Sequence, residues 1–138
     1  MVYLDSNVFL YPLVYDERAE PKAKAAARVL RDVTGGRVKG VSSALTWDEV
    51  AWVVWRVVGY DEAVKAGSRL LSLSNVEFVE VSDLVLVKAQ ALVEKYGLKP
   101  RDSIHVATAL LVREVEVVSD DEELDRVREI KRIPLIEP

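Results

Sequence analysis

The sequence predicts an α/β fold of three layers, with helices covering both faces of a central and mainly parallel sheet. Short apolar runs typical of buried strands alternate along the chain with longer segments whose apolar residues recur at helical spacing. Half of the 138 residues are hydrophobic and 30% are charged, which is the balance of a folded globular domain. No repeat, linker or low-complexity tract interrupts the chain, so residues 1–138 are expected to form one domain.

The first third of the chain is predicted to contain two strands and the helical sequence between them. The apolar run at residues 2–5 ends abruptly in polar residues, as a buried strand does. Residues 9–15 follow as a short helical turn that Pro12 breaks. The alanine-rich residues 21–33 predict a solvated helix, and residues 38–41 predict the second strand.

The middle of the chain is predicted to be mainly helical. Thr46 and Glu49 form a capping-box pattern, which predicts a helix from this point to residue 58. Residues 61–73 predict a second helix, and residues 78–81 predict a strand.

The last third is predicted to repeat the alternation of helix and strand. Helices are expected at residues 83–96 and 102–113, and a strand at 115–118. A short helix over residues 122–128 and a final strand over 133–136 complete the predicted fold.

The composition excludes several kinds of site. The chain has no cysteine, which excludes a disulfide scaffold, a thiolate zinc site and a cysteine nucleophile. His105 is the only histidine, which excludes zinc sites built on two or more imidazoles. The metal chemistry that remains is ligation by oxygen.

The charge balance and hydropathy bear on location and partners. The chain has 23 acidic and 19 basic side chains, a net charge of −4, which by itself argues against a nucleic-acid partner. No apolar run approaches the ~20 residues of a membrane span, and the start of the chain lacks the pattern of a signal peptide. We therefore expect a cytoplasmic protein with no membrane contact.

Acidic residues occur at the predicted ends of strands and starts of helices. Asp5 follows the first strand, Asp120 and Asp121 follow the strand at 115–118, and Glu49 and Asp102 lie at helix starts. These places can converge on one edge of an α/β sheet, where ligands bind. Several carboxylates without histidine or thiol suit a hard ion, Mg²⁺ or Mn²⁺.

Each of these acids also has a purely structural interpretation. Glu49 and Asp102 are residue types favoured at helix starts by the helix dipole, and the acids at 120–125 suit the start of a short helix. Asp5 has no obvious capping role, and a buried charge must be paired or coordinated, which favours a functional role for it.

Four sequence blocks, in this order, resemble the PIN-domain family, and most closely the VapC-type toxin ribonucleases of toxin–antitoxin pairs. The blocks are YLDSNVFL at residues 3–10, LTWDEV at 45–50, PRDSIHVATAL at 100–110 and VSDDEELD at 118–125. The resemblance spans nearly the whole chain and implies a PIN-like three-layer fold.

The resemblance also implies an acidic metal site. Asp5, Glu49 and Asp102 match acids that ligate metal or orient metal-bound water. The family pattern Ser-x-Asp-x-x-Phe-Asp favours Asp121 as the fourth acid, with leucine in the aromatic position, and leaves Asp120 as the alternative.

Other residues match polar positions around such a site. Ser6, Asn7 and Ser119 are expected to hydrogen-bond the carboxylates or bound water. Arg101 is expected to bind a substrate phosphate, unless it is only a solvated flank. His105 is expected either to touch substrate or, as a lone histidine on an apolar helix more often does, to pack and make one hydrogen bond.

The function implied is hydrolysis of RNA phosphodiester bonds by a Mg²⁺-dependent endoribonuclease, with Mn²⁺ as a second possible ion. Family members of this kind are held inactive by an antitoxin protein and commonly form homodimers. The alternative is a catalytically inactive PIN-like domain that binds RNA or a protein partner. A phosphatase using the Asp5 position is disfavoured, because that chemistry needs an acid where Asn7 stands.

The helix predicted from Thr46 carries tryptophans on more than one face. Trp52 lies off the stripe that holds Trp47 and Trp55. A helix that is apolar nearly all round is buried or lies in an interface. Trp52 and Val53 are therefore predicted either to contact a second copy or an antitoxin, or to belong to the core.

Overall fold

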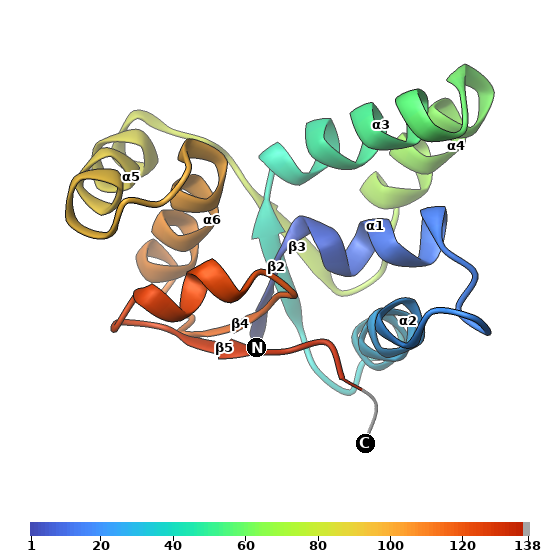
Figure 1. The fold of residues 1–138 in the computed structure, drawn as a ribbon, viewed down its shortest axis with the longest axis horizontal. Helices are drawn as coiled ribbons and strands as arrows, with labels where there is room; N and C mark the ends of the chain where they lie inside the picture. The colour runs from blue at the N-terminus through green and yellow to red at the C-terminus, as the bar shows by residue number, and fades with distance from the viewer. Residues whose placement is uncertain (137–138) are drawn as a thin grey trace.

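The structure, a computed structural model, describes residues 1–136 and is built around a five-stranded sheet (Figure 1). The strand order is β3-β2-β1-β4-β5, and every neighbouring pair is parallel. The strands are β1 (Val2–Leu4), β2 (Gly40–Ser43), β3 (Val76–Val79), β4 (Glu116–Val118) and β5 (Lys131–Ile133).

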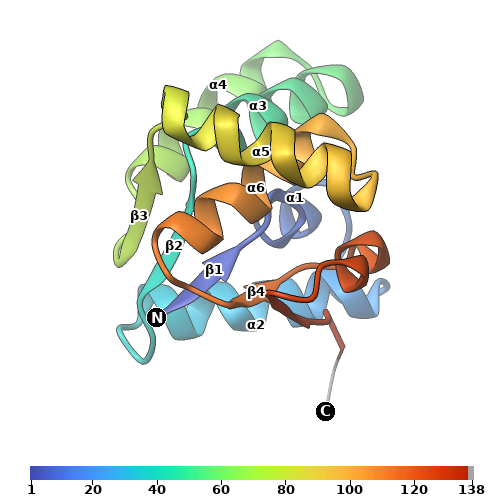
Figure 2. The ribbon, with the colours of Figure 1, turned by 90° about the vertical axis from the view of Figure 1, so that its left-hand side faces the viewer.

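Helices cover both faces of this sheet, as predicted. Figure 1 shows α1 to α4 on one side and α5 with α6 on the other, and Figure 2 places α5 and α6 in front of the strands. The helices are α1 (Ser6–Val14), α2 (Pro21–Thr34), α3 (Leu45–Val57), α4 (Tyr60–Leu71), α5 (Asp83–Tyr96), α6 (Pro100–Leu111) and the 3₁₀ helix η1 (Glu122–Arg126).

The core is divided into two clusters by the sheet. Successive side chains of a strand point to opposite faces. Leu4 and Val118 therefore pack against α1 to α4, whereas Tyr3 and Val117 pack against α5, α6 and η1. This alternation confirms the three-layer architecture.

The direction of chain progression reverses at β1. The chain passes from β1 to β2 and β3 on one side and then returns to β4 and β5 on the other. The carboxyl ends of β1 and β4 therefore flank a topological switch point, the place where open α/β sheets bind ligands.

The first helix differs from the prediction of a short turn broken by Pro12. It begins directly at Ser6, because Asp5 accepts the Ser6 N–H on its carboxylate and the Val8 N–H on its carbonyl. Proline removes only the hydrogen bond that residue 12 would donate. The helix continues past it, and the Tyr15 N–H closes its end on the Tyr11 carbonyl.

The predicted capping box at Thr46 is wrong. Helix α3 begins at Leu45, whose N–H donates to Ser43 Oγ at 3.1 Å. Thr46 is buried, and its hydroxyl shares a hydrogen bond of 2.7 Å with Ser42 Oγ. The chain turns into the helix straight from β2, so Thr46 already lies in the first turn.

Three strands are shifted from their predicted positions. β2 lies at residues 40–43 rather than 38–41, β3 at 76–79 rather than 78–81, and β5 at 131–133 rather than 133–136. β5 has only one neighbouring strand. Such an edge position admits charged residues, and Arg132 pairs there with Asp125 at 2.9 Å.

Within the described part of the chain, no helix combines the length and the apolar character needed to cross a membrane.

Candidate active site

The acids singled out in the sequence come from four separate parts of the fold and meet at the carboxyl edge of the sheet. Asp5 directly follows β1, and Asp121 follows β4 as the residue that caps η1. Asp102 lies in the first turn of α6, and Glu49 in the first turns of α3. Hydrogen bonds and the close approach of carboxylates link these elements.

Asp5 is the most buried of these acids, with 4% of its surface exposed. Its Oδ1 accepts the backbone N–H of Ser6 at 2.8 Å, and its Oδ2 accepts the hydroxyl of Ser119 at 2.6 Å. The expectation that Asp5 has no capping role is therefore wrong, because its carboxylate caps α1. The same carboxylate lies 3.6 Å from Nε2 of His105, which links it to α6.

Ser119 joins the ends of β1 and β4. Besides donating to Asp5, its hydroxyl accepts the backbone N–H of Asp121 at 3.0 Å and the side-chain amide of Asn7 at 3.3 Å. Asn7 also accepts the backbone N–H of Asp120 at 3.3 Å. Ser119 and Asn7 thus orient the acids of both strand ends, and Ser6 takes part through its backbone N–H.

A second group of carboxylates lies between α6 and η1. Oxygens of Asp102, Asp121 and Glu123 all lie within 4.8 Å of one another, a spacing that could hold a metal ion. The sequence reasoning missed Glu123. Its only signal was a place in the acidic run at residues 120–125, where no feature distinguished it from its neighbours.

The electrostatics of this group favour a proton or a cation. Burial, followed by the nearby charges of Asp121 and Asp5, raises the pKa of Asp102 from its ordinary value to about 7. A carboxyl group in such surroundings holds its proton at a pH at which an ordinary aspartate is ionised. A bound divalent ion would relieve the same repulsion.

Asp120 lies differently from Asp121, although the two are adjacent. Its carboxylate accepts the hydroxyl of Tyr11 at 2.7 Å and pairs with the ammonium of Lys22 at 3.0 Å. Burial and the Asp120 charge raise the pKa of Tyr11 above its ordinary value, so the hydroxyl remains a donor. Asp120 therefore ties α1 and α2 to the end of β4, whereas Asp121 faces Asp102.

Glu49 is linked to the core through His105. The Nε2 of His105 lies 2.5 Å from Glu49 Oε1, and its Nδ1 lies 2.7 Å from the hydroxyl of Tyr3. Burial lowers the pKa of His105, but the charges of Asp5 and Glu49 outweigh it, so the pKa lies above the ordinary value.

The two residues expected to bind substrate lie in contrasting places. His105 is 1% exposed and uses both ring nitrogens inside the protein, which agrees with the packing alternative and not with substrate contact. Arg101 is mostly exposed at the start of α6, with its guanidinium 4.0 Å from Asp48. Arg101 thus remains available at the rim of the acidic site.

The donor set suits a hard divalent cation. The groups that converge are carboxylate oxygens, and the one imidazole among them is turned to Glu49. Mg²⁺ and Mn²⁺ prefer such oxygen ligands and bind phosphate oxygens as well. The residues present therefore fit a metal of this class at the carboxyl edge of the sheet.

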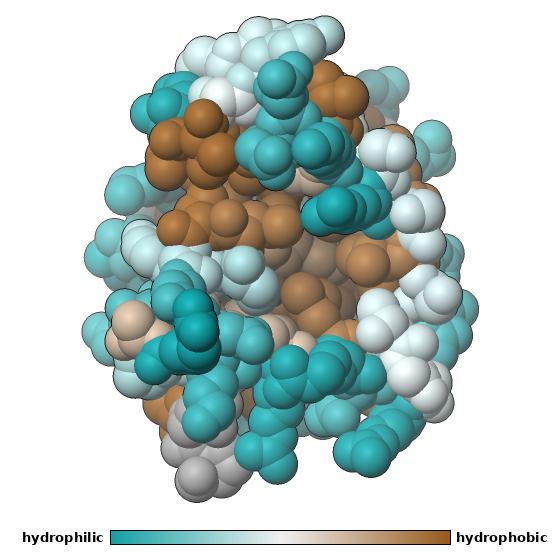
Figure 3. Space-filling view, turned by 90° about the vertical axis from the view of Figure 1, so that its right-hand side faces the viewer, coloured by the Kyte–Doolittle hydropathy of each residue, from teal (hydrophilic) through white to brown (hydrophobic). Residues whose placement is uncertain are grey.

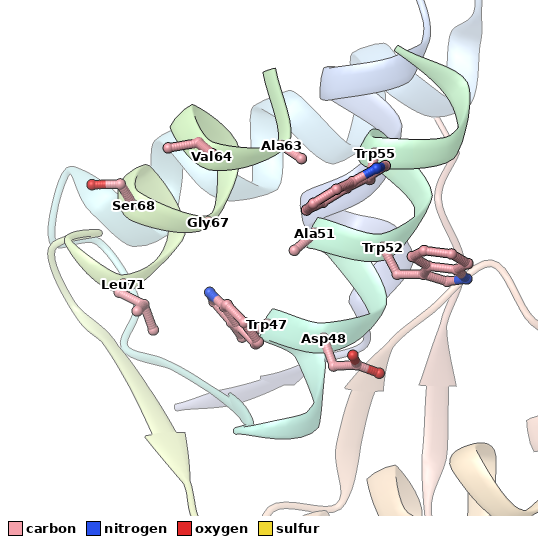
Figure 4. A pocket seen from close by; sticks show the side chains of 10 residues that line it. All are labelled: Trp47, Asp48, Ala51, Trp52, Trp55, Ala63, Val64, Gly67, Ser68 and Leu71. Carbon is pink, nitrogen blue, oxygen red and sulfur yellow. The ribbon is translucent and has the colours of Figure 1, made fainter. Parts of the chain in front are cut away.

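The opposite side of α3 borders an apolar groove. This α3–α4 groove has a volume of about 390 Å³, and its lining includes Trp47, Trp52 and Trp55. Figure 4 shows Trp47 and Trp55 turned toward α4, whereas the indole of Trp52 extends away from α4 (Figure 4). All three indoles are about half exposed. Gly67 makes the close approach of the helices possible, since a Cβ there would lie 3.0 Å from Nε1 of Trp47.

A second apolar hollow lies between α1, α2 and α4, on the face seen in Figure 3 (Figure 3). Its volume is about 170 Å³. The residues that line it are Phe9, Pro12, Leu13, Leu30, Ala66, Arg69, Leu70 and Leu73.

Solved toxin structures have a similar fold. VapC20 of Mycobacterium tuberculosis, a Sarcin-Ricin loop cleaving toxin, matches with a TM-score of 0.74 and 14% identity over 91% of this chain and 93% of that one. VapBC2 of Rickettsia felis, bound to a DNA fragment from its promoter, matches with a TM-score of 0.71 and 15% identity, over 97% of this chain and 98% of that one. A toxin–antitoxin complex from Klebsiella pneumoniae matches with a TM-score of 0.70 and 20% identity, over 95% of this chain and 96% of that one.

No curated protein sequence matches the chain. The sequence model of the PIN domain, however, matches residues 2–130, which include every acid of the site described above. The chain therefore belongs to the PIN domain family.

Proposed function

We propose that this protein is a Mg²⁺-dependent endoribonuclease of the VapC type, the toxin of a type II toxin–antitoxin pair. The observation that carries the proposal is the convergence of Asp5, Glu49, Asp102 and Asp121 at the topological switch point of the sheet. Membership of the PIN domain family and the fold shared with the toxin structures support it.

In this proposal the four acids hold the cation, with Mn²⁺ as an alternative ion. The bound ion would lower the pKa of a water molecule and stabilise the charge that develops on the phosphodiester. Ser119 and Asn7 hold the carboxylate of Asp5 and the backbone of the β4 end in place. The Ser6 N–H fixes the second oxygen of Asp5.

We assign the fourth acidic position to Asp121 rather than Asp120. The support is the proximity of Asp121 to Asp102, together with the ion pair of Asp120 with Lys22 and its hydrogen bond from Tyr11. Glu123 joins the proposed set because its carboxylate lies in the same cluster. Arg101, exposed beside the acids, is proposed to bind a phosphate of the RNA.

The proposed partners are an antitoxin protein and a second copy of the chain. Similar structures include a toxin–antitoxin complex and VapBC2, which supports an antitoxin for this chain. Trp52, which is 51% exposed and turned away from α4, is proposed to lie in the homodimer contact together with the half-buried Val53. The proposed site of action is the cytoplasm.

The alternative function is a PIN domain that binds RNA or a protein without cutting it. The two are separated by incubating the partner-free protein with structured RNA in Mg²⁺ or in EDTA. We expect the wild-type protein to cleave RNA in Mg²⁺ but not in EDTA, and we expect Asp102→Asn to lose this cleavage. Asp83→Asn is the matched control, because Asp83 also lies in the first turn of a helix but is exposed and does not belong to the acid cluster.

Cleavage that persists in EDTA or in Asp102→Asn would refute the proposed mechanism. Absence of cleavage on a diverse set of RNAs, with the metal bound, would favour the binding-only alternative.

A further inference from the structure

A buried series of hydrogen-bonded side chains connects Tyr3 of β1 through His105 to Glu49. The Tyr3 hydroxyl lies 2.7 Å from Nδ1 of His105, and Nε2 of the same ring lies 2.5 Å from Glu49 Oε1. Tyr3 and His105 are 0% and 1% exposed. Both ring nitrogens are therefore used inside the protein, and the ring is out of reach of any substrate.

The hydrogen bond between His105 and Glu49 has a defined direction. A carboxylate only accepts hydrogen bonds, so Nε2 of His105 carries a hydrogen and donates it to Glu49. A ring that is protonated only there accepts the Tyr3 hydroxyl at Nδ1. The tyrosine and imidazole rings also meet edge to face, with centroids 5.9 Å apart. Turning the imidazole over would break both bonds.

The position of the Glu49 carboxylate depends on a single hydrogen bond, whereas several hydrogen bonds hold the Asp5 carboxylate. Each oxygen of Asp5 accepts a separate hydrogen bond, from the Ser6 N–H and from the Ser119 hydroxyl. Within residues 1–136, the recorded hydrogen bond of the Glu49 carboxylate is the one from His105 to Oε1. Oε1 thus has one of its lone pairs engaged by His105, and Oε2 is the freer oxygen for another ligand.

We propose that His105, held by Tyr3, is a positioning residue that fixes Glu49 so that only Oε2 is offered to the cation. This inference rests on the proposed function, in which Glu49 is a metal ligand. A carboxylate restricted to one oxygen suits Mg²⁺ and Mn²⁺, which demand octahedral geometry. It disfavours Ca²⁺, which takes six to eight oxygens and readily uses both oxygens of a carboxylate.

The test measures metal binding by isothermal titration calorimetry without RNA, using Mn²⁺ and Ca²⁺ as probes. Tyr3→Phe keeps the packing of the ring and removes the hydroxyl, and we expect it to weaken Mn²⁺ binding about 10-fold. His105→Leu removes the donor, and we expect a loss of roughly 10- to 100-fold for Mn²⁺ with a smaller loss for Ca²⁺. His105→Gln retains an N–H donor toward Glu49 and is expected to recover part of the Mn²⁺ affinity.

Tyr11→Phe is the matched control, because Tyr11 bonds Asp120 and not Glu49. It should leave the Mn²⁺ and Ca²⁺ affinities unchanged. Since His105 is the only histidine, its ring also gives the only imidazole signals in a ¹H–¹⁵N spectrum of the metal-free protein. We expect a hydrogen on Nε2, and signals that shift in Tyr3→Phe but not in Tyr11→Phe.

The outcomes separate this inference from the proposed function. Mn²⁺ binding that Tyr3→Phe and His105→Leu leave unchanged, in variants that still fold, would overturn the positioning role alone. A wild-type protein that binds no Mn²⁺ would overturn both. Metal binding that follows the expected pattern in a protein that cuts no RNA would support the positioning role and refute the nuclease.

Discussion

The carboxylates of Asp102 and Asp121 face each other within 4.8 Å, across the gap between α6 and η1. Strand β4 separates the two residues in the sequence, and each lies at the start of a helical segment. Their proximity raises the pKa of Asp102, together with burial, which has the larger effect. The metal-free site is therefore a source of instability when these acids are ionised, and a bound cation would remove it.

The first prediction concerns the pH dependence of the metal-free protein. The pKa of Asp102 is raised in the fold from its ordinary value to about 7. Its contribution to stability is thus greatest below the ordinary pKa and is lost as the pH rises through about 7. In EDTA, we expect Asp102→Asn to have a higher Tm than wild type at pH 8 and a smaller advantage at pH 4. Thermal unfolding followed by circular dichroism measures this, with Asp83→Asn as the control.

An Asp102→Asn variant with a lower Tm than wild type at pH 8 in EDTA would contradict the prediction. It would mean that the Asp102 carboxylate makes a favourable contact that outweighs the repulsion from Asp121.

The second prediction concerns metal addition. A ligand that binds only the folded protein stabilises it by about 2.7 kcal/mol at 100 times its Kd. We expect Mg²⁺ to raise the Tm of wild type, with a larger effect at pH 8 than at pH 6, because the ion displaces the proton shared by the acids. Na⁺ at equal ionic strength is the control, and a Tm shift of the same size with Na⁺ would indicate simple screening.

The third prediction separates the two adjacent acids at the end of β4. Asp121→Asn should reduce RNA cleavage at least about 100-fold, because it alters the proposed metal site. Asp120→Asn should reduce it less than about 3-fold, because Asp120 contacts Lys22 and Tyr11. Its Tm should change little, because a partly exposed ion pair contributes only about 0–1 kcal/mol. Equal losses of activity in both variants would refute the assignment.

Much of the fold could be predicted from the sequence, because the burial pattern of each element is local. The apolar strand before Asp5 and the helix ending at Gly97 were both found in this way, and the glycine adopts the left-handed conformation that such an end favours. The first and last residues of the strands were predicted less accurately than those of the helices. β5 carries Lys131 and Arg132, whose charges hide a strand from any rule based on apolar runs.

The candidate site could be predicted only in part, for a related reason. Acids at strand ends indicate a shared edge, since parallel strands end on the same side of a sheet. The contact between Tyr3 and His105 spans 102 positions, and no local pattern encodes it. The same holds for Asp120. The family pattern favoured Asp121 over it, but no local pattern encodes the contacts of Asp120, because its partners, Tyr11 and Lys22, come from other helices.

The fourth prediction concerns the packing of α3 on α4. A methyl group at position 67 would lie 3.0 Å from Nε1 of Trp47, so the indole or the helices must move. We expect Gly67→Ala to destabilise the protein by about 1–3 kcal/mol in chemical unfolding and to change the tryptophan fluorescence. Ser68→Ala, at the adjacent exposed position, should do neither. Unchanged stability in Gly67→Ala would show that the α3–α4 groove widens freely.

The last prediction concerns the two sides of α3. Trp52 projects away from α4, whereas Trp55 points toward it and contacts the ring of Tyr60 at 5.0 Å between centroids. Both indoles are about half exposed, so exposure alone does not distinguish them. An aromatic side chain buried in an interface contributes more to binding than its neighbours do. Because the proposed homodimer contact lies on the outer side of α3, Trp52→Ser should weaken self-association at least about 10-fold, while Trp55→Ser should leave it within about 3-fold. Sedimentation velocity over a range of concentrations measures both, and the reverse order would move the contact to the α3–α4 groove.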